Sequence, residues 1–404
     1  MLVHCSLRGV ILRNLGGTAG NNLLSHFYGA GVFYFIKGSV FEKGCFIMKK
    51  MRSLSAILAA ALALTAFAGC GATDNSSTTD NASDNTSAAD NAETVASDEA
   101  VSENSYKIGV IQYGSHPSLD NCFSGIEQAL TESDLELTID RQDGNFDSAT
   151  CDTIAKNMAA KQYDMIFAIA TPAAVSAFAA TANTDIPVIF CAVSDPVAAG
   201  LVEDMNAPGG NCTGTSDILD FSAQLDLIQA LQPEVKKIGV LYTTSEANSV
   251  SQLASLREAA DPRGIEIVDQ GVQGAADVPQ AAASLVTKVD CVNNFTDNNV
   301  VSNLTVLLEQ ANSANIPVYG SEIEQVINGC MASVSIDYVA LGRATADMGI
   351  RVLGGESAGT IPVGKISDGT AVVNTEVMDK FGITLPDSYA DAEKVTSADK
   401  EDAE

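Results

Sequence analysis

The sequence has little of what most catalytic and metal sites require. It contains no tryptophan and three histidines among 404 residues, and His116 is the only histidine after residue 26. One imidazole cannot form a two-histidine metal site, and neither an HExxH motif nor a close Cys/His cluster occurs. The phosphate-binding pattern GxxxxGK[ST] is also absent. We therefore expect no catalytic residue, no metal and no cofactor, which argues against an enzyme.

Cations are scarce as well. The chain has 22 lysines and arginines against 51 aspartates and glutamates, for a formal charge of -29. Such a charge repels nucleic acids and anionic membrane surfaces, so we expect neither as the main partner. After residue 70 no apolar run reaches the length of about 20 residues that a membrane-spanning helix needs.

The nine cysteines form no CxxC pair. Six of them lie in the body of the chain, mostly in apolar segments, where cysteine usually behaves as a small buried hydrophobe. We expect free thiols, with disulfides as the alternative for an exported protein. The six are Cys122, Cys151, Cys191, Cys212, Cys291 and Cys330.

A secretory signal is predicted at residues 48–69. Basic residues at 48–52 precede an apolar run and then Ala-Gly-Cys70, which resembles a bacterial lipobox, although Phe67 stands where that motif prefers leucine. We expect Cys70 to be lipidated; the alternative is a signal cleaved elsewhere. Because such a signal acts at an N-terminus, we expect residues 1–47 to be a mis-annotated upstream translation.

Polar segments flank the predicted body. Residues 71–104 are mainly Asp, Asn, Ser, Thr and Ala, a composition that cannot bury enough apolar surface to fold. We expect residues 70–105 to form a lipidated, disordered tether. Residues 387–404 are predicted to be a flexible acidic tail.

Between these segments, short apolar runs alternate with helical patterns, which is typical of α/β folds with parallel sheets. Residues 107–111 (KIGVI) resemble residues 237–241 (KIGVL), and the IPV of 186–188 recurs at 316–318, both 130 positions later. This repeat predicts two Rossmann-like lobes in tandem, with ligand groups at the carboxyl ends of the strands.

Three crossovers are predicted to join the lobes and to act as a hinge. They are expected within 211–217, 333–338 and 361–374. The N-terminal lobe then comprises 106–215 plus 335–360, and the C-terminal lobe 216–334 plus 361–386.

The loops after the predicted strands are rich in hydroxyls, amides and carboxylates and contain no Lys or Arg. A phosphate ester is therefore a poor ligand, and a free amino acid fits better. Its ammonium could bind Asp195, Asp297 or Glu322. Its carboxylate could lie at helix N-termini, where backbone N–H groups and the dipole favour an anion. The hydroxyls that could assist are those of Thr171, Ser194, Ser245 and Ser249.

Each of these side chains could instead be an ordinary helix N-cap. Tyr113 and Phe295 could stack on a planar ligand or pack against neighbouring helices. His116 could contact the ligand or only shape its loop. The full candidate set is Tyr113, His116, Thr171, Ser194, Asp195, Ser245, Asn248, Ser249, Asp297 and Glu322.

Several motifs resemble ABC-transporter substrate-binding lipoproteins of the tryptophan/tyrosine uptake type. They include IGVIQY at 108–113, AIATPAA at 168–174, VSDPV at 193–197, SEANS at 245–249 and TDN at 296–298. The resemblance covers nearly all of the body. It implies a type I periplasmic-binding fold that captures an amino acid, often aromatic.

The same resemblance implies a lipid-anchored, extracytoplasmic receptor that delivers its solute to ABC permease and ATPase subunits. We expect a monomer that touches the membrane only through its anchor. One departure is Asn294-Phe295, where this family more often has Tyr and Pro, so the ligand stays open. The alternative function is a sensor of the same fold coupled to a signalling partner.

Overall fold

The computed structural model describes residues 105–366 and 369–397. The predictions for residues 1–47, for the signal at 48–69 and for Cys70 with its tether lie outside these ranges. Within the described ranges, no helix is long and apolar enough to cross a membrane.

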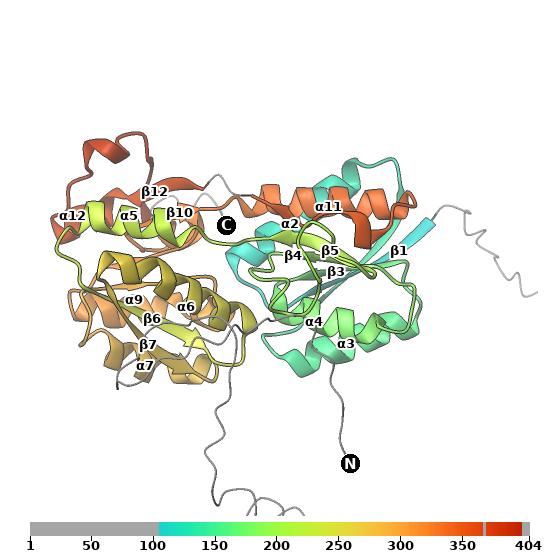
Figure 1. The fold of residues 1–404 in the computed structure, drawn as a ribbon, viewed down its shortest axis with the longest axis horizontal. Coiled ribbons are helices and arrows are strands. Elements are labelled where there is room, and N and C mark those ends of the chain that lie inside the picture. Colours follow the sequence, from blue (N-terminus) through green and yellow to red (C-terminus); the bar gives the residue numbers. More distant parts are fainter. Residues whose placement is uncertain (1–104, 367–368, 398–404) are drawn as a thin grey trace, which may run out of the picture. The chain divides into compact units, whose positions relative to one another are not determined.

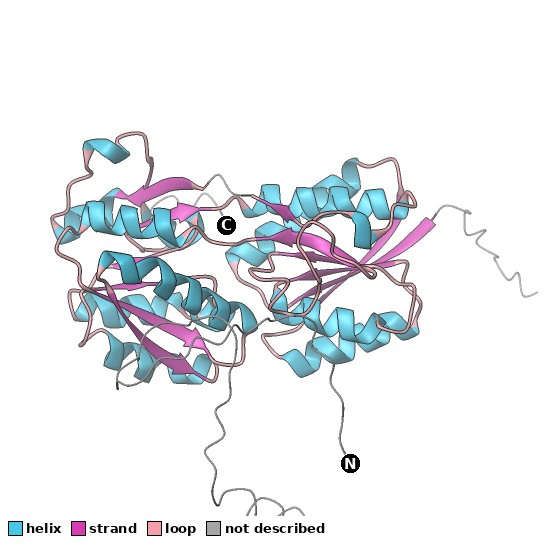
Figure 2. Ribbon diagram, viewed as in Figure 1, coloured by secondary structure: helices cyan, strands magenta, loops and turns pink. Residues whose placement is uncertain are grey.

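The first lobe contains a six-stranded, all-parallel sheet in the order β11-β5-β4-β3-β1-β2 (Figures 1 and 2). The central strands β3 and β4 are fully buried and rich in Ile, Val and Phe, as expected for strands covered on both faces. The strands are β1 Ser105–Gln112, β2 Glu136–Asp143, β3 Met165–Ile169, β4 Val188–Cys191, β5 Cys212–Ser216 and β11 Gly364–Lys365.

Helices cover both faces of this sheet. Figure 1 shows α2 and α11 on one face and α3 and α4 on the other. The backbones of α2 and α11 approach closely, because a Cβ on Gly342 would lie 2.1 Å from the carbonyl oxygen of Cys122. Helix α11, which follows most of the second lobe in the sequence, thus completes the first lobe. These helices are α2 Pro117–Glu132, α3 Ser148–Ala160, α4 Thr171–Thr181 and α11 Tyr338–Leu353.

The second lobe has a parallel four-stranded sheet in the order β7-β6-β8-β9 and a three-stranded sheet in the order β10-β12-β13. Its strands are β6 Lys237–Thr243, β7 Glu266–Val272, β8 Cys291–Asn293, β9 Val318–Tyr319, β10 Ala332–Ser335, β12 Thr370–Asn374 and β13 Glu393–Val395. Its helices are α5 Phe221–Leu231, α6 Ala247–Ala260, α7 Val278–Leu285, α8 Asn298–Ser302, α9 Leu304–Ser313, α10 Ile323–Ile327 and α12 Thr375–Phe381.

The two lobes share one strand order, because β2-β1-β3-β4 corresponds to β7-β6-β8-β9. The strands that carry the repeated motifs, β1 with β6 and β4 with β9, take equivalent places. The predicted fold class, two Rossmann-like lobes with parallel sheets, is therefore confirmed.

Three boundaries differ from the predicted ones. The expected hinge at 211–217 is mostly strand β5, whose sequence of small polar residues (CTGTS) does not resemble a strand although every residue is buried. The chain stays in the first lobe as far as Lys365, beyond the expected exit at 361, because β11 pairs with β5. Within the expected tail, β13 pairs with β12 and buries Val395.

The six cysteines of the described residues are free and buried. Burial raises the pKa of the Cys212 thiol to about 12, so it stays protonated at neutral pH. The expectation of free thiols agrees with this arrangement.

Candidate functional site

A cavity lies where the strand-end loops of the two lobes meet. The first lobe contributes His116, Ser118, Thr171 and Ser194; the second contributes Asn248, Thr296, Asn298 and Glu322; Asp217 and Tyr338 come from the crossovers. Its volume of about 20 Å³ leaves room for about one water molecule.

Four helices of at least eleven residues begin at this cavity, as does the short α8 at Asn298. Thr171 and Tyr338 are the first residues of α4 and α11, and Ser118 and Asn248 are the second residues of α2 and α6. The first turn of a helix leaves N–H groups free and carries partial positive charge. The electrostatic environment of the cavity therefore favours an anionic group such as a carboxylate.

Two alanines at the cavity have left-handed backbone conformations, which non-glycine residues rarely adopt. Ala170 has φ +76° and follows β3, and Ala192 has φ +55° and follows β4. Strain of this kind concentrates at binding sites, where it fixes a required loop shape. It supports a functional role for these two loops.

Two buried acids line the cavity. Glu322 is 1% exposed, and its Oε2 has no hydrogen-bond partner within residues 105–366 and 369–397. Burial, and then the neighbouring Glu324, hold the pKa of Glu322 well above its usual range. Asp217 accepts hydrogen bonds from the Ser194 hydroxyl (2.9 Å) and the Tyr338 hydroxyl (3.1 Å), and burial raises its pKa.

Among the residues that the structure describes, no lysine or arginine lines the cavity to balance these acids. A buried charge is costly unless it is paired, and a titratable group then tends to neutralise instead. A bound cation would pair with Glu322 and Asp217 and favour their ionised forms. The site is therefore suited to an ammonium group.

Further polar atoms at the cavity have no hydrogen-bond partner among the described residues. The Nε2 of His116 lies 3.5 Å from the Oδ1 of Asn298, across the two lobes, while its Nδ1 has no partner. Burial lowers the pKa of His116 to about 4, so the ring is neutral at neutral pH. The Oδ1 of Asn248 and the hydroxyl of Thr171 are also buried without a partner. Buried polar atoms are rarely left unpaired, so their convergence indicates a ligand site.

Other hydrogen bonds join the lobes around the cavity. The Gln252 amide donates to the Ser194 hydroxyl at 3.0 Å, and the Ser251 hydroxyl donates to Asp195 at 2.6 Å. The Asn121 amide donates to Glu324. These contacts can form only when the lobes are together, so they contribute to closure.

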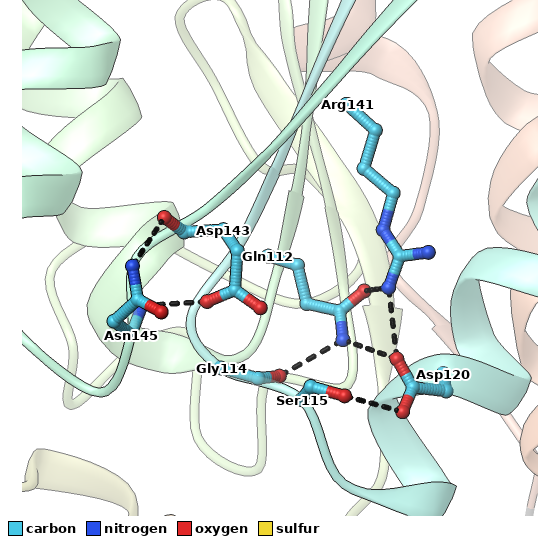
Figure 3. Close-up of polar contacts among 7 residues, drawn as sticks. All are labelled: Gln112, Gly114, Ser115, Asp120, Arg141, Asp143 and Asn145. Atoms are coloured by element: carbon cyan, nitrogen blue, oxygen red, sulfur yellow. Dashed lines mark hydrogen bonds and ion pairs between the residues drawn. The ribbon is translucent and has the colours of Figure 1, made fainter.

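The loop that carries His116 is held by a polar network at the end of β1 (Figure 3). The Gln112 amide donates to the carbonyl of Gly114 and to Asp120, both at 2.8 Å. Arg141 donates to Gln112 and to Asp120, again at 2.8 Å. The Ser115 hydroxyl also donates to Asp120. The network thereby fixes the loop to the start of α2.

The structure brings half of the candidate residues together. Those that line the cavity are His116, Thr171, Ser194, Asn248 and Glu322. Tyr113, Asp195, Ser245, Ser249 and Asp297 do not line it.

The two aspartates outside the cavity have local partners. The carboxylate of Asp195 accepts from the Ala198 N–H at 2.9 Å in addition to Ser251. Asp297 is fully buried, accepts from the hydroxyls of Thr243 and Ser249, and caps α8. Asp297 is therefore not placed to receive a ligand ammonium in this arrangement, whereas Asp195 lines a separate, larger cavity of about 550 Å³.

The expected aromatic stacking residues pack within their own lobes. The Tyr113 hydroxyl donates to the Phe146 carbonyl at 3.0 Å, and the two rings meet edge to face. Phe295 packs against Phe221 in the same way. Tyr338 is the tyrosine that lines the cavity.

Asp217 and Tyr338 were not among the candidates, because we assigned their segments to the hinge, although both also stand in motifs that resemble the family. Crossovers of a two-lobed protein pass beside the cleft, and this topological fact was the signal that could have identified them. Asn298 was quoted in a motif but not chosen.

No described group of three His, Cys, Asp or Glu residues could hold a metal ion. A GxSxG pattern occurs at residues 355–359. It follows helix α11 and not a strand, so it lacks the strand-to-helix turn that exposes a nucleophilic serine.

Comparison with known proteins identifies the family. The family described as ABC transporter substrate binding protein matches residues 107–396. A "Tyrosine-binding protein" of Clostridioides difficile (strain R20291) is 37% identical over 339 residues, which cover 82% of this chain and 92% of the relative.

Solved structures of similar proteins point to the same family. An ABC domain from Streptococcus pneumoniae in complex with L-Trp is 36% identical, with a TM-score of 0.70, covering 72% of this chain and 99% of that one. A ligand-free, open substrate-binding protein from Clostridium difficile is 37% identical, with a TM-score of 0.56 and the same coverage. This chain belongs to the ABC transporter substrate-binding protein family.

Proposed function

We propose that this protein captures a free aromatic L-amino acid between its lobes and delivers it to an ABC permease. The observation that carries the proposal is the pairing of two charge preferences in one cavity. Glu322 and Asp217 lack a cationic partner there, and four helix N-termini converge on the same space. A zwitterion meets both preferences, its ammonium at the acids and its carboxylate at the helix ends.

The aromatic class is supported by two relatives, one described as tyrosine-binding and one solved with L-Trp. The TM-score is higher with the L-Trp complex (0.70) than with the open, ligand-free structure (0.56), although the identities are nearly equal. The described arrangement therefore resembles the L-Trp complex more than the open, ligand-free structure. A cavity of about 20 Å³ must widen to hold a tyrosine, so binding requires the lobes to open and reclose.

A thermal-shift screen of the protein against the twenty amino acids tests this proposal. A ligand that binds only the folded state stabilises it by about 2.7 kcal/mol at 100 times its Kd. We expect L-tyrosine or L-tryptophan to raise the unfolding midpoint, and L-aspartate and L-lysine to leave it unchanged. A shift from no amino acid, with a shift from a sugar or nucleoside, would contradict the amino-acid assignment.

The family acts outside the cytoplasm, and we propose that this member is held there by a lipid on Cys70, after removal of a signal at 48–69. The support is the basic, apolar and Ala-Gly-Cys succession in that segment. Labelling cells with a fatty-acid analogue should mark the wild-type protein, and Cys70→Ser should lose the label and leave the membrane fraction. Retention of the label by Cys70→Ser would refute the anchor.

A further inference from the structure

Glu246 is a buried carboxylate beside the cavity that does not line it. Its side chain is 2% exposed, and amide groups surround it. Its Oε2 accepts from the Nδ2 atoms of Asn298 (2.6 Å) and Asn248 (3.1 Å), and its Oε1 accepts from the Nδ2 of Asn299 (2.9 Å). All four residues belong to the second lobe.

Burial, and then the neighbouring Asp297, raise the pKa of Glu246 to about 7, while the hydrogen bonds from Asn298 and Asn248 favour its ionised form. Above that pH the carboxylate is mostly ionised and only accepts hydrogen bonds, so every amide that touches it presents its NH₂ group. The carbonyl oxygens of these amides are therefore turned away from Glu246. For Asn298, this turn places Oδ1 toward the Nε2 of His116 in the other lobe. Asn248 has a second acceptor, the carbonyl of Thr296 at 3.1 Å, which holds it in the same orientation.

The orientation of Asn298 decides the tautomer of His116. A neutral imidazole carries one proton, and a nitrogen that faces a carbonyl oxygen is the one that keeps it. The proton then sits on Nε2, and Nδ1 becomes an acceptor. This Nδ1 and the Oδ1 of Asn248 are both buried without a partner on residues that line the cavity.

We propose that Glu246 is a positioning residue that sets the hydrogen-bond polarity of the ligand cavity. Through Asn298 it keeps Nδ1 of His116 an acceptor, and it helps to keep Oδ1 of Asn248 an acceptor. A cavity with such acceptors beside Glu322 selects a ligand with an ammonium over an analogue that lacks one. This inference rests on the proposed function. It explains why the cavity would prefer a ligand that carries an amine.

The first test reads the tautomer directly. The ¹⁵N spectrum of histidine-labelled full-length protein, with the His116 signal identified by its loss in His116→Gln, should show the proton on Nε2. Glu246→Met removes both acceptor oxygens, so Asn298 can turn and a mixture of tautomers is expected. Glu246→Gln keeps one acceptor oxygen for Asn298 and should restore the wild-type spectrum. Glu132→Met, at an exposed ion pair with Arg343, is the control that should change nothing.

A proton on Nδ1 in the wild-type protein overturns the proposal, as does a wild-type tautomer in a folded Glu246→Met. If Glu246→Met does not fold, Asn298→Leu replaces it, because that change removes the relay and leaves Glu246 in place. A mixture of tautomers in Asn298→Leu then supports the relay, and an unchanged tautomer overturns it.

The second test measures selectivity with L-tyrosine and 3-(4-hydroxyphenyl)propionate, which differ only in the amine. We expect the wild-type protein to prefer the amine by at least about 100-fold, because unpaired buried acceptors discriminate strongly. Glu246→Met should lower this ratio at least about tenfold, mainly by weakening the binding of tyrosine. An unchanged ratio contradicts the proposal. If the wild-type protein binds neither compound, the proposed function fails, while the tautomer test still decides the role of Glu246.

Discussion

Replacing Glu322 with glutamine is expected to weaken amino-acid binding by about 100-fold to 1,000-fold, the loss typical of removing one partner from a buried charge pair. The amide keeps the shape of the side chain and removes the charge that would hold the ligand ammonium. Isothermal titration calorimetry with L-tyrosine and with L-tryptophan measures the effect. Because Glu322 lies at the N-terminal boundary of α10 without capping it, the change should leave the fold intact.

The same substitution, Glu322→Gln, should not lower the stability of the ligand-free protein. The pKa of Glu322 is raised in the folded state, so folding favours its protonated form, and its contribution to stability declines as pH rises above the ordinary range of a glutamate. At neutral pH, Glu322→Gln should therefore leave the unfolding midpoint unchanged or raise it. Lost affinity with retained stability marks a residue that is kept for binding.

Asp195→Asn provides the comparison, because the sequence alone placed the ammonium there as readily as at Glu322. Its carboxylate contacts Ser251 and a backbone N–H outside the cavity, so we expect less than about a fivefold loss, through weaker closure. Wild-type affinity in Glu322→Gln, or a larger loss in Asp195→Asn, would contradict the assignment.

Affinity for a zwitterionic amino acid should fall as the pH is lowered. Burial raises the pKa of both Asp217 and Glu322 in the free protein, and a bound ammonium favours their ionised forms. Binding therefore releases protons. Below the raised pKa of each acid, Kd should increase by up to about tenfold per pH unit. His116 stays neutral until about pH 4, so it does not contribute over most of this range.

Titration calorimetry across the pH range checks this prediction. Glu322→Gln and Asp217→Asn should each flatten the pH dependence, because each removes one titrating group. Exposed Glu132→Gln is the matched control and should keep the wild-type profile. An affinity independent of pH, or one that increases on acidification, would show that the acids do not hold the ligand.

Much of the fold could be predicted because its signals are local. Strand β3 lies within one of the short apolar runs, which begins after Asp164 and ends before Thr171. The motif repeated after 130 residues correctly indicated equivalent strands in two lobes. Strand β5 was missed because its buried residues are mostly Thr, Gly and Ser, which do not form an apolar run. Strand β11 was missed because a strand of two residues is too short to show a periodic pattern. Both strands depend on a neighbouring strand that the local pattern does not contain.

The site was only half predictable, for a different reason. Asp297 and Glu322 both follow strands of the second lobe, and sequence treats them alike. In the structure Asp297 caps a helix with its carboxylate, while Glu322 has an oxygen without a partner at the cavity. The direction of a side chain, toward its own helix or toward the opposite lobe, depends on tertiary packing. Glu246 escaped notice for the same reason, since its role depends on three amides that lie around it.

The most direct test of the central claim is the crystal structure of the protein grown with L-tyrosine. We predict one molecule between the lobes, with its ammonium nitrogen within hydrogen-bonding distance of Glu322 and Asp217 and its carboxylate at the N-termini of the converging helices. A tyrosine bound in the opposite orientation, or outside the cavity between the lobes, would contradict the account.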